Sequence, residues 1–443
     1  MQTSRTPGVS PDQVHDTLRK WILVDGYPVV CDLDASHGAT LVDSRTGREF
    51  LDFFGCFGST PIGWNHPALR QEAFLAGAAS AVANRPANSD LYTPEMAAFV
   101  DSFGRHLAPE GYRHFFFVDG GALAVENALK VAFDWKVRRN RAKGVDADVG
   151  TKVLHFRHAF HGRSGYTMSL TNTDPKKVEY FPKFPWPRVD SPALRFPLDD
   201  AALADARAAE AASLAQIDAA FAQHGDDIAA ILIEPIQCEG GDRHFRAEFL
   251  QALQARCERY DCLFICDEVQ TGFYASGKTW SFQHYGIQPD VVAFGKKSQQ
   301  CGVMAGPKVD LVPGNVFETS SRINSTWGGN LVDMVRATAI LEVVEQDNLA
   351  ANAAARGEQW LAGMQEIAAA LPEKVSNVRG LGLILAFDLP DGAARNACLK
   401  TMTEKGLLGL ACGPRSVRFR PHLAVTAEDV DRCLALTRES LGA

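Results

Sequence analysis

The chain has 443 residues, 46% of them hydrophobic, so it can bury large cores, and its length suggests about two or three domains rather than a disordered protein. The formal net charge of −8 provides no basic surface that would attract nucleic acid or an anionic membrane. Small-molecule chemistry is therefore the expected class of function.

The N-terminal sequence and the cysteines limit the location and the cofactors. The segment MQTSRTPGVSPDQ lacks the apolar core of a signal peptide, and no later run approaches the roughly 20 apolar residues of a membrane span. We therefore expect a cytoplasmic protein with no membrane association. The ten cysteines are scattered, with no Cys-x-x-Cys pair, so no metal site is predicted.

The first 330 residues contain two patterns. Residues 28–54 contain short strand-like runs separated by the turn signals SHG and SRTG, which predicts an antiparallel meander. From about residue 60 to 330, short apolar runs alternate with helical patterns, which predicts a mostly parallel sheet wrapped by helices. These runs are FFFV at 115–118, VLHF at 153–156, AAILI at 229–233, CLFIC at 262–266 and VVAF at 291–294.

The C-terminal part has a mixed pattern. A helical segment begins near Leu331, the strand-like runs LGLILAF and SVRFRP follow, and Thr426 with Asp429 forms a capping pair for a final helix. The predicted fold class is α/β, with a large domain of mostly parallel sheet wrapped by helices and a smaller α+β domain. We expect the large domain to comprise residues 61–330, and the small domain to comprise residues 1–60 and 331–443.

A glycine turn follows the first predicted strand of the large sheet. Ligands of open parallel sheets bind beyond the carboxyl ends of the strands, so the residues that follow each apolar run are site candidates. After FFFV comes Asp119-Gly120-Gly121-Ala122 and then a helical pattern, and such a helix N-terminus presents free N–H groups that suit a phosphate. The turn alone is weak evidence, because it matches neither a Walker sequence nor a dinucleotide-binding fingerprint.

Charged residues follow three further runs. Glu234 follows AAILI, Asp267 follows CLFIC, and Gly295-Lys296-Lys297 follows VVAF. A carboxylate at the end of a buried strand is costly unless a cation pairs with it, and a protonated pyridine nitrogen is such a cation. Asp267 could keep such a ring protonated as an electron sink, while a simple helix cap is an equally good interpretation.

The lysine pair and an aromatic segment complete the candidates. An amine in such a cleft loses its proton more easily, which is the condition for forming a Schiff base, so Lys296 is the candidate and Lys297 its competitor. An ordinary surface lysine is the alternative. In HAFHGRSGY, Phe160 could stack on a flat heterocycle and Arg163 presents a planar fork for a carboxylate. A core aromatic and a solvated arginine are the alternatives there.

Six ordered motifs over roughly residues 28–430 resemble those of the class III (ω-amino acid) aminotransferases, which have the fold type I architecture. The motifs are GGALAVENALK, AFHGR, EPIQCEGG, ICDEVQTGF, AFGKKSQQ and NSTWGGN. Within the family, the pattern is most similar to the L-lysine 6-transaminase branch. The resemblance implies pyridoxal 5'-phosphate as the cofactor.

The resemblance implies a role for each matching residue of the cofactor site. Lys296 matches the lysine that holds the cofactor as a Schiff base, and Asp267 matches the partner of its pyridine nitrogen. Thr326 matches a threonine that reaches the phosphate from the neighbouring subunit, which implies a homodimer with shared active sites. The other matches are Gly121 and Ala122 at the phosphate, Phe160 on the ring, Glu234 in the pocket wall and Gln270 near the phenolic oxygen.

The resemblance also implies that the substrates are L-lysine and 2-oxoglutarate, and that the products are 2-aminoadipate 6-semialdehyde and glutamate. The terminal amine has no carboxylate beside the reacting carbon, whereas the oxo acid has one. In the family, a glutamate pairs with an arginine in the first half-reaction and swings away in the second. Glu239 matches this gate and Arg418 matches the carboxylate clamp, while Arg163, helped by Asn324, would hold the distant carboxylate.

Four positions depart from the common family pattern. Phe160 replaces a tyrosine, Gly121-Ala122 replaces a serine-type turn, and Cys238 and Lys297 replace small residues. These departures are similar to those of the lysine 6-transaminase branch. Three alternatives stay open: ornithine or another ω-amine as donor, since one methylene changes binding by only about 1–3 kcal/mol, an aminomutase, and a binding protein that lacks the cofactor.

Overall fold

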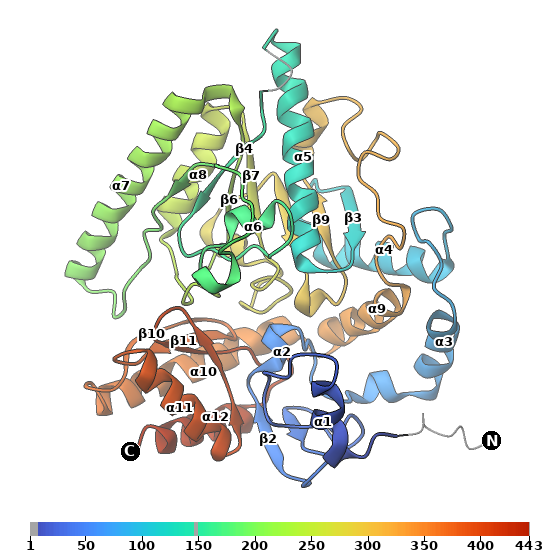
Figure 1. Ribbon diagram of the computed structural model, residues 1–443, viewed down its shortest axis with the longest axis vertical. Helices are drawn as coiled ribbons and strands as arrows, with labels where there is room; N and C mark the ends of the chain where they lie inside the picture. The colour runs from blue at the N-terminus through green and yellow to red at the C-terminus, as the bar shows by residue number, and fades with distance from the viewer. Residues whose placement is uncertain (1–7, 146–148, 443) are drawn as a thin grey trace.

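The computed structural model describes residues 8–145 and 149–442, and a seven-stranded sheet lies at its centre (Figure 1). The strand order is β3-β9-β8-β7-β6-β4-β5, and all neighbouring pairs are parallel except those that β9 makes with β3 and β8. The prediction of a mostly parallel α/β sheet is confirmed. The strands are β3 (His114–Val118), β4 (Lys152–Phe156), β5 (Arg188–Val189), β6 (Ile228–Ile233), β7 (Leu263–Asp267), β8 (Val291–Phe294) and β9 (Cys301–Ala305).

Side chains of the central strands alternate between two hydrophobic cores. Phe264 belongs to the core that includes α4 (Pro94–Leu107) and α8 (Ala247–Arg259), whereas the next residue, Ile265, belongs to the core that includes α5 (Gly121–Ala142). Burial of each side chain of this size stabilises the folded state by roughly 1.5–3 kcal/mol. Figure 1 shows α5 and α8 beside the sheet, with α7 (Asp200–His224) outside α8. The sheet is therefore covered on both faces, and its strand ends are free to form a site.

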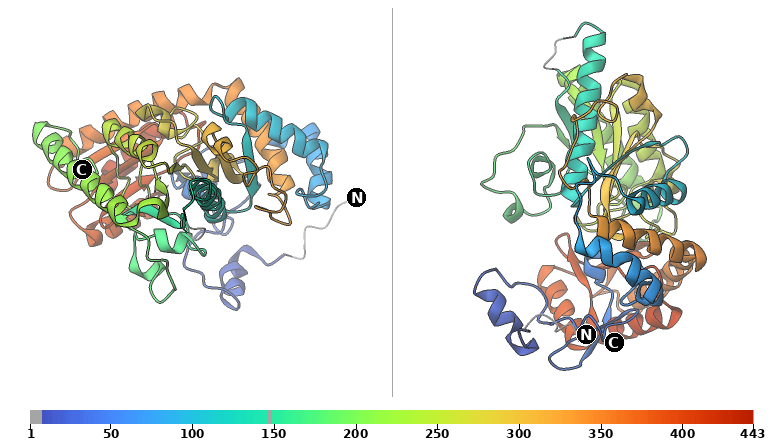
Figure 2. Two further views of the ribbon diagram at one scale, coloured as in Figure 1. Left: turned by 90° about the horizontal axis from the view of Figure 1, so that it is seen from above. Right: turned by 90° about the vertical axis from the view of Figure 1, so that its right-hand side faces the viewer.

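Two smaller sheets lie together at the other end of the molecule, where the N-terminal and C-terminal parts of the chain meet (Figures 1 and 2). In one of them β12 from the C-terminal part pairs in parallel with β2 from the N-terminal part. The predicted division at residues 60 and 330 stays a prediction. The strands are β1 (Thr40–Val42), β2 (Glu49–Asp52) and β12 (Leu407–Leu408) in one sheet, and β10 (Ser376–Leu381), β11 (Ile384–Asp388), β13 (Leu410–Cys412) and β14 (Ser416–Phe419) in the other.

The predicted capping pair begins the last helix. The hydroxyl of Thr426 accepts the N–H of Asp429 at 3.1 Å, and the carboxylate of Asp429 accepts the N–H of Thr426 at 2.9 Å. Further helices are α1 (Val14–Arg19), α2 (Gly55–Gly58), α3 (Glu72–Ala83), α6 (Thr167–Leu170), α9 (Leu331–Gln346), α10 (Leu349–Ala370), α11 (Gly392–Glu404) and α12 (Ala427–Ser440).

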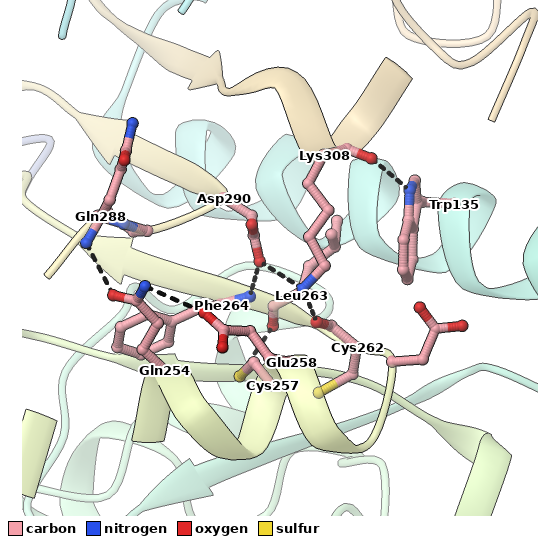
Figure 3. Close-up of polar contacts among 12 residues, drawn as sticks. Trp135, Gln254, Cys257, Glu258, Cys262, Leu263, Phe264, Gln288, Asp290 and Lys308 are labelled. Atoms are coloured by element: carbon pink, nitrogen blue, oxygen red, sulfur yellow. Dashed lines mark hydrogen bonds and ion pairs between the residues drawn. The ribbon is translucent and has the colours of Figure 1, made fainter. Parts of the chain in front are cut away.

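A partly buried polar group joins the amino ends of β7 and β8 (Figure 3), whereas the site residues follow the carboxyl ends of these strands. The Lys308 ammonium donates to the carbonyl of Cys262 at 2.7 Å and pairs with Asp290 at 3.1 Å. The same Asp290 carboxylate accepts the N–H of Phe264 at 2.7 Å, and the indole of Trp135 donates to the Lys308 carbonyl at 3.0 Å. These bonds hold two central strands and α5 together.

Over 8–145 and 149–442, no helix is long and apolar enough to cross a membrane. The same residues contain no group of three or more His, Cys, Asp or Glu side chains that could hold a metal ion. All ten cysteines are free thiols.

Candidate active site

A cavity of 1110 Å³ opens where β6, β7 and β8 end. Its walls combine the N-terminal part of the chain, the strand ends of the large sheet and β14. Two predicted site residues, Asn324 and Thr326, are exposed and do not line it. All other predicted site residues do: Gly121, Ala122, Phe160, Arg163, Glu234, Glu239, Asp267, Gln270, Lys296 and Arg418.

The side chains of the adjacent residues Lys296 and Lys297 lie in different environments. Lys296 lines the cavity, and burial, with a smaller effect of Arg418, lowers the pKa of its amine below the ordinary value. Its backbone has φ 54°, a left-handed conformation that costs roughly 1–2 kcal/mol for a residue other than glycine. Lys297 is buried behind the wall and donates to the carbonyls of Thr60 at 3.1 Å and Pro421 at 2.8 Å. Of these two lysines, Lys296 is the one that can offer its amine to a ligand in the cavity.

Lys297 links stability to pH. Burial lowers the pKa of its amine from 10.5 to about 7, with Arg420 adding to the shift and Asp52 opposing it. The folded protein therefore releases this proton near pH 7, whereas the unfolded chain keeps it up to pH 10.5. Because the unfolded chain binds more protons between these values, the stability from this group rises from pH 7 to 10.5 and is lost as the pH falls back.

As the pH rises from about 7 to about 9.5, we expect the melting temperature of the unsubstituted protein to increase by about 2–4 °C relative to the melting temperature of a Lys297→Met variant. The neutral amine keeps two N–H donors for its two carbonyl partners, so only the penalty for burying charge is removed. Thermal unfolding of both proteins over this pH range measures the difference. A difference that stays constant with pH would contradict the assignment.

Asp267, the last residue of β7, is buried and held from two sides. One carboxylate oxygen lies 2.8 Å from Nδ1 of His161, and the other accepts the N–H of Val269 at 3.0 Å. Residues 269–272 form turns, so Asp267 does not cap a helix there. The neighbouring Glu268 faces away from the cavity and accepts the N–H of Phe282 at 2.7 Å. Asp267 is thus the acid of this pair that can face a cationic ring nitrogen.

Glu234 fixes the backbone that carries Phe160. One oxygen of its carboxylate accepts the N–H of Phe160 at 2.9 Å, and the other accepts the N–H of Cys238 at 3.1 Å. Burial raises the pKa of Glu234 well above its ordinary value, and the nearby Asp267 adds to the shift. The Phe160 ring itself lines the cavity, where it can stack on a flat ligand.

The N-terminus of α5 forms a cradle without side chains. Gly120 precedes the helix with φ 101° and supplies no side-chain cap, so the first N–H groups of this 22-residue helix stay open to a ligand. A Cβ atom on Gly121 would lie 2.7 Å from Cγ1 of Val269, and one on Gly162 would lie 2.5 Å from Cβ of Ala122. This close packing leaves backbone donors as the recognition groups, which suits a phosphate.

A second polar group surrounds the Arg418 guanidinium on β14. Arg418 is 2% exposed, and it donates to Glu239 at 2.8 Å and to Gln270 at 2.9 Å. The same Gln270 oxygen accepts a bond from Arg420 at 3.1 Å. Lys177 forms an ion pair with the other oxygen of Glu239. The cavity therefore holds one carboxylate between two cations.

His161, Cys301 and Lys177 are among the cavity residues that were not predicted. His161 lay in a quoted motif without a role, although a histidine beside the stacking aromatic could have indicated a partner for the strand-end aspartate. Cys301 begins β9, a strand that was not predicted, and it lines the cavity. Lys177 comes from the short 3-10 helix Pro175–Lys177, and its sequence surroundings carry no indication of a site.

Comparison with known proteins covers nearly the full chain. A family model described as Aminotransferase class-III matches residues 23–440. The L-lysine-epsilon aminotransferase of Mycobacterium tuberculosis (strain ATCC 25618 / H37Rv) is 50% identical, over 98% of this chain and 96% of that protein. The L-lysine-epsilon aminotransferase of Streptomyces clavuligerus is 49% identical, over 97% of this chain and 94% of that protein. A solved structure of the lysine aminotransferase from M. tuberculosis in the internal aldimine form is 50% identical, with a TM-score of 0.96 over 98% of this chain and 99% of that one.

Proposed function

This chain belongs to the class III aminotransferases, and from that premise we propose that it transfers the terminal amino group of L-lysine to 2-oxoglutarate, giving 2-aminoadipate 6-semialdehyde and glutamate. Lysine as the amine donor is supported by relatives about half identical over nearly their whole length. The predicted fold type I architecture and dependence on pyridoxal phosphate are confirmed by the family and by the solved lysine aminotransferase.

The cavity residues fit this cofactor. The open N–H groups around Gly121 and Ala122 suit its phosphate, the Phe160 ring suits a flat heterocycle, and Glu234 holds that ring in place. Lys296 supplies the only lysine amine among the predicted site residues, and Asp267 supplies the carboxylate for the ring nitrogen. When bound, pyridoxal phosphate supplies an aldehyde that takes up the amino group and a ring that takes up electrons from the C–H bond that breaks.

In the proposed mechanism Lys296 moves the proton. Its amine takes a proton from the substrate carbon that carries the amino group and later returns one, and its lowered pKa lets it act as a base. Asp267 holds a proton at the pyridine nitrogen, and the bond to His161 keeps its carboxylate in position. Gln270, held by Arg418, would lie near the phenolic oxygen.

The observation that carries the proposed substrates is the Glu239–Arg418 pair in the same cavity as Lys296. The side chain of L-lysine presents an amine with no adjacent carboxylate, so without Glu239 the Arg418 guanidinium would have no anionic partner in that half-reaction. Glu239 neutralises it at 2.8 Å. When 2-oxoglutarate binds, its carboxylate would replace Glu239 on Arg418, and Arg163 would hold the distal carboxylate.

We also propose a homodimer in the cytoplasm, with Thr326 and Asn324 acting in the partner's site. Both residues are exposed and lie outside the cavity of their own chain. Exposed apolar residues on and after α3 support a protein interface: Leu75, Val82, Leu91 and Tyr92.

A panel of amine donors tests the proposed function. The holoenzyme is incubated with 2-oxoglutarate and L-lysine, L-ornithine or 4-aminobutyrate, and glutamate is measured. We expect L-lysine to exceed L-ornithine in kcat/KM by about tenfold or more, because one methylene in a fitted pocket changes selectivity by about 10–200-fold.

Two outcomes would replace the proposal. A preference for ornithine or 4-aminobutyrate would assign a different donor to the same chemistry. Conversion of lysine without an added oxo acid would indicate an aminomutase, because that reaction keeps the amino group on one substrate.

A further inference from the structure

Lys177 holds the gate residue from the side opposite Arg418. Its ammonium forms an ion pair with Oε1 of Glu239, while Oε2 of Glu239 accepts a bond from Arg418 at 2.8 Å. The same ammonium lies 5.5 Å from the centre of the Phe160 ring. Glu239 thus bridges two cations that come from different parts of the fold, and the reaction described above uses only one of them.

The two cations differ in freedom. The Arg418 side chain is 2% exposed, sits on β14 and also binds Gln270 at 2.9 Å. The Lys177 side chain is 25% exposed and lies at the end of a three-residue 3-10 helix. Arg418 therefore stays in place when its partner changes, whereas the flexible lysine stem can follow a moving carboxylate.

The exchange of partners on Arg418 creates a problem for Glu239. When an oxo acid places its carboxylate on Arg418, Glu239 loses one cation and faces a second carboxylate. A partly buried carboxylate without a partner is costly, and two adjacent carboxylates repel each other. A second cation already bonded to the departing side chain removes most of this cost.

We propose that Lys177 is a positioning residue that retains Glu239 while Arg418 binds the carboxylate of the oxo acid. The inference rests on the proposed function, because it concerns the second half-reaction. It predicts unequal effects on the two substrates. Loss of Lys177 leaves Glu239 paired with Arg418, which suits the lysine half-reaction, but it makes release of Arg418 to the oxo acid harder.

Lys177→Met and a matched control test this role in the holoenzyme. Lys176→Met removes the same charge from the adjacent, exposed residue of the same 3-10 helix. Calorimetry measures the binding of glutarate, an unreactive dicarboxylate with the same carbon chain as the oxo acid, and single-turnover kinetics measures each half-reaction. We expect Lys177→Met to weaken glutarate binding and raise KM for 2-oxoglutarate by about tenfold, with the lysine half-reaction within about twofold and Lys176→Met unchanged.

A double-mutant cycle separates positioning from direct contact. If Lys177 acts through Glu239, the Lys177→Met effect on glutarate binding disappears in a Glu239→Gln background. An effect that persists there would mean that Lys177 binds the substrate itself, and would overturn the proposal.

The proposed function and this inference fail differently. An unsubstituted holoenzyme that neither consumes L-lysine nor binds glutarate would refute the proposed function, and this inference with it. An unsubstituted enzyme that does both, with Lys177→Met indistinguishable from Lys176→Met, would refute the role of Lys177 alone.

Discussion

Replacing Lys296 with alanine is expected to lower turnover by at least about 10⁴-fold, because the variant loses the amine that we propose both binds the cofactor and moves the proton. Lys296 lines the same cavity as the residues predicted to bind the cofactor, and burial lowers the pKa of its amine. The adjacent Lys297 cannot replace it, since its buried amine donates to two backbone carbonyls. The absorbance of the lysine-bound cofactor should disappear together with activity.

Lys297→Met is the matched control, because it removes the amine of the adjacent lysine and leaves Lys296 unchanged. We expect this variant to keep the absorbance band and the turnover per bound cofactor, although its stability changes with pH differently. The measurement is an absorbance spectrum together with steady-state turnover. A normal band in Lys296→Ala that is lost in Lys297→Met would exchange the roles of the two lysines.

The positions of the central site residues were predictable because these residues lie at strand ends. Glu234, Asp267 and Lys296 each follow a continuous apolar run, and such runs indicate buried parallel strands. Three neighbouring parallel strands place their carboxyl ends at one edge, so these residues had to lie close together. The roles of Glu239, Gln270 and Arg418 came from the family resemblance instead, because no periodic pattern indicates them.

The parts that escaped prediction depend on tertiary contacts. The strand CGVMA is short, contains a glycine and follows a polar turn, so its insertion between β3 and β8 is decided by pairing rather than by local preference. Lys177 reaches the cavity from the short 3-10 helix Pro175–Lys177, and the amino-acid composition of this surface segment does not predict where it lies in the fold. Asn324 and Thr326 are exposed in the single chain, and their proposed role requires a second subunit.

Replacing Asp267 with asparagine is expected to lower turnover on the order of 10³-fold, because a neutral amide cannot stabilise a proton on the ring nitrogen. The substitution keeps the size of the side chain. The amide oxygen of the asparagine can still accept a hydrogen bond from His161 or from the N–H of Val269. In the unsubstituted protein these groups lie 2.8 and 3.0 Å from the Asp267 carboxylate oxygens. Folding and cofactor content should therefore change little, so the loss reports the missing charge.

Asp267→Glu separates charge from position. This variant keeps the carboxylate but moves it by one methylene in a site where Asp267 is 5% exposed and held by two bonds. We expect it to retain more activity than Asp267→Asn, because a displaced charge still favours the protonated ring. Rates per bound cofactor measure both variants. If Asp267→Asn stays within about tenfold of the unsubstituted enzyme while Asp267→Glu is inactive, the packing of this carboxylate matters more than its charge, and the ring nitrogen does not need it.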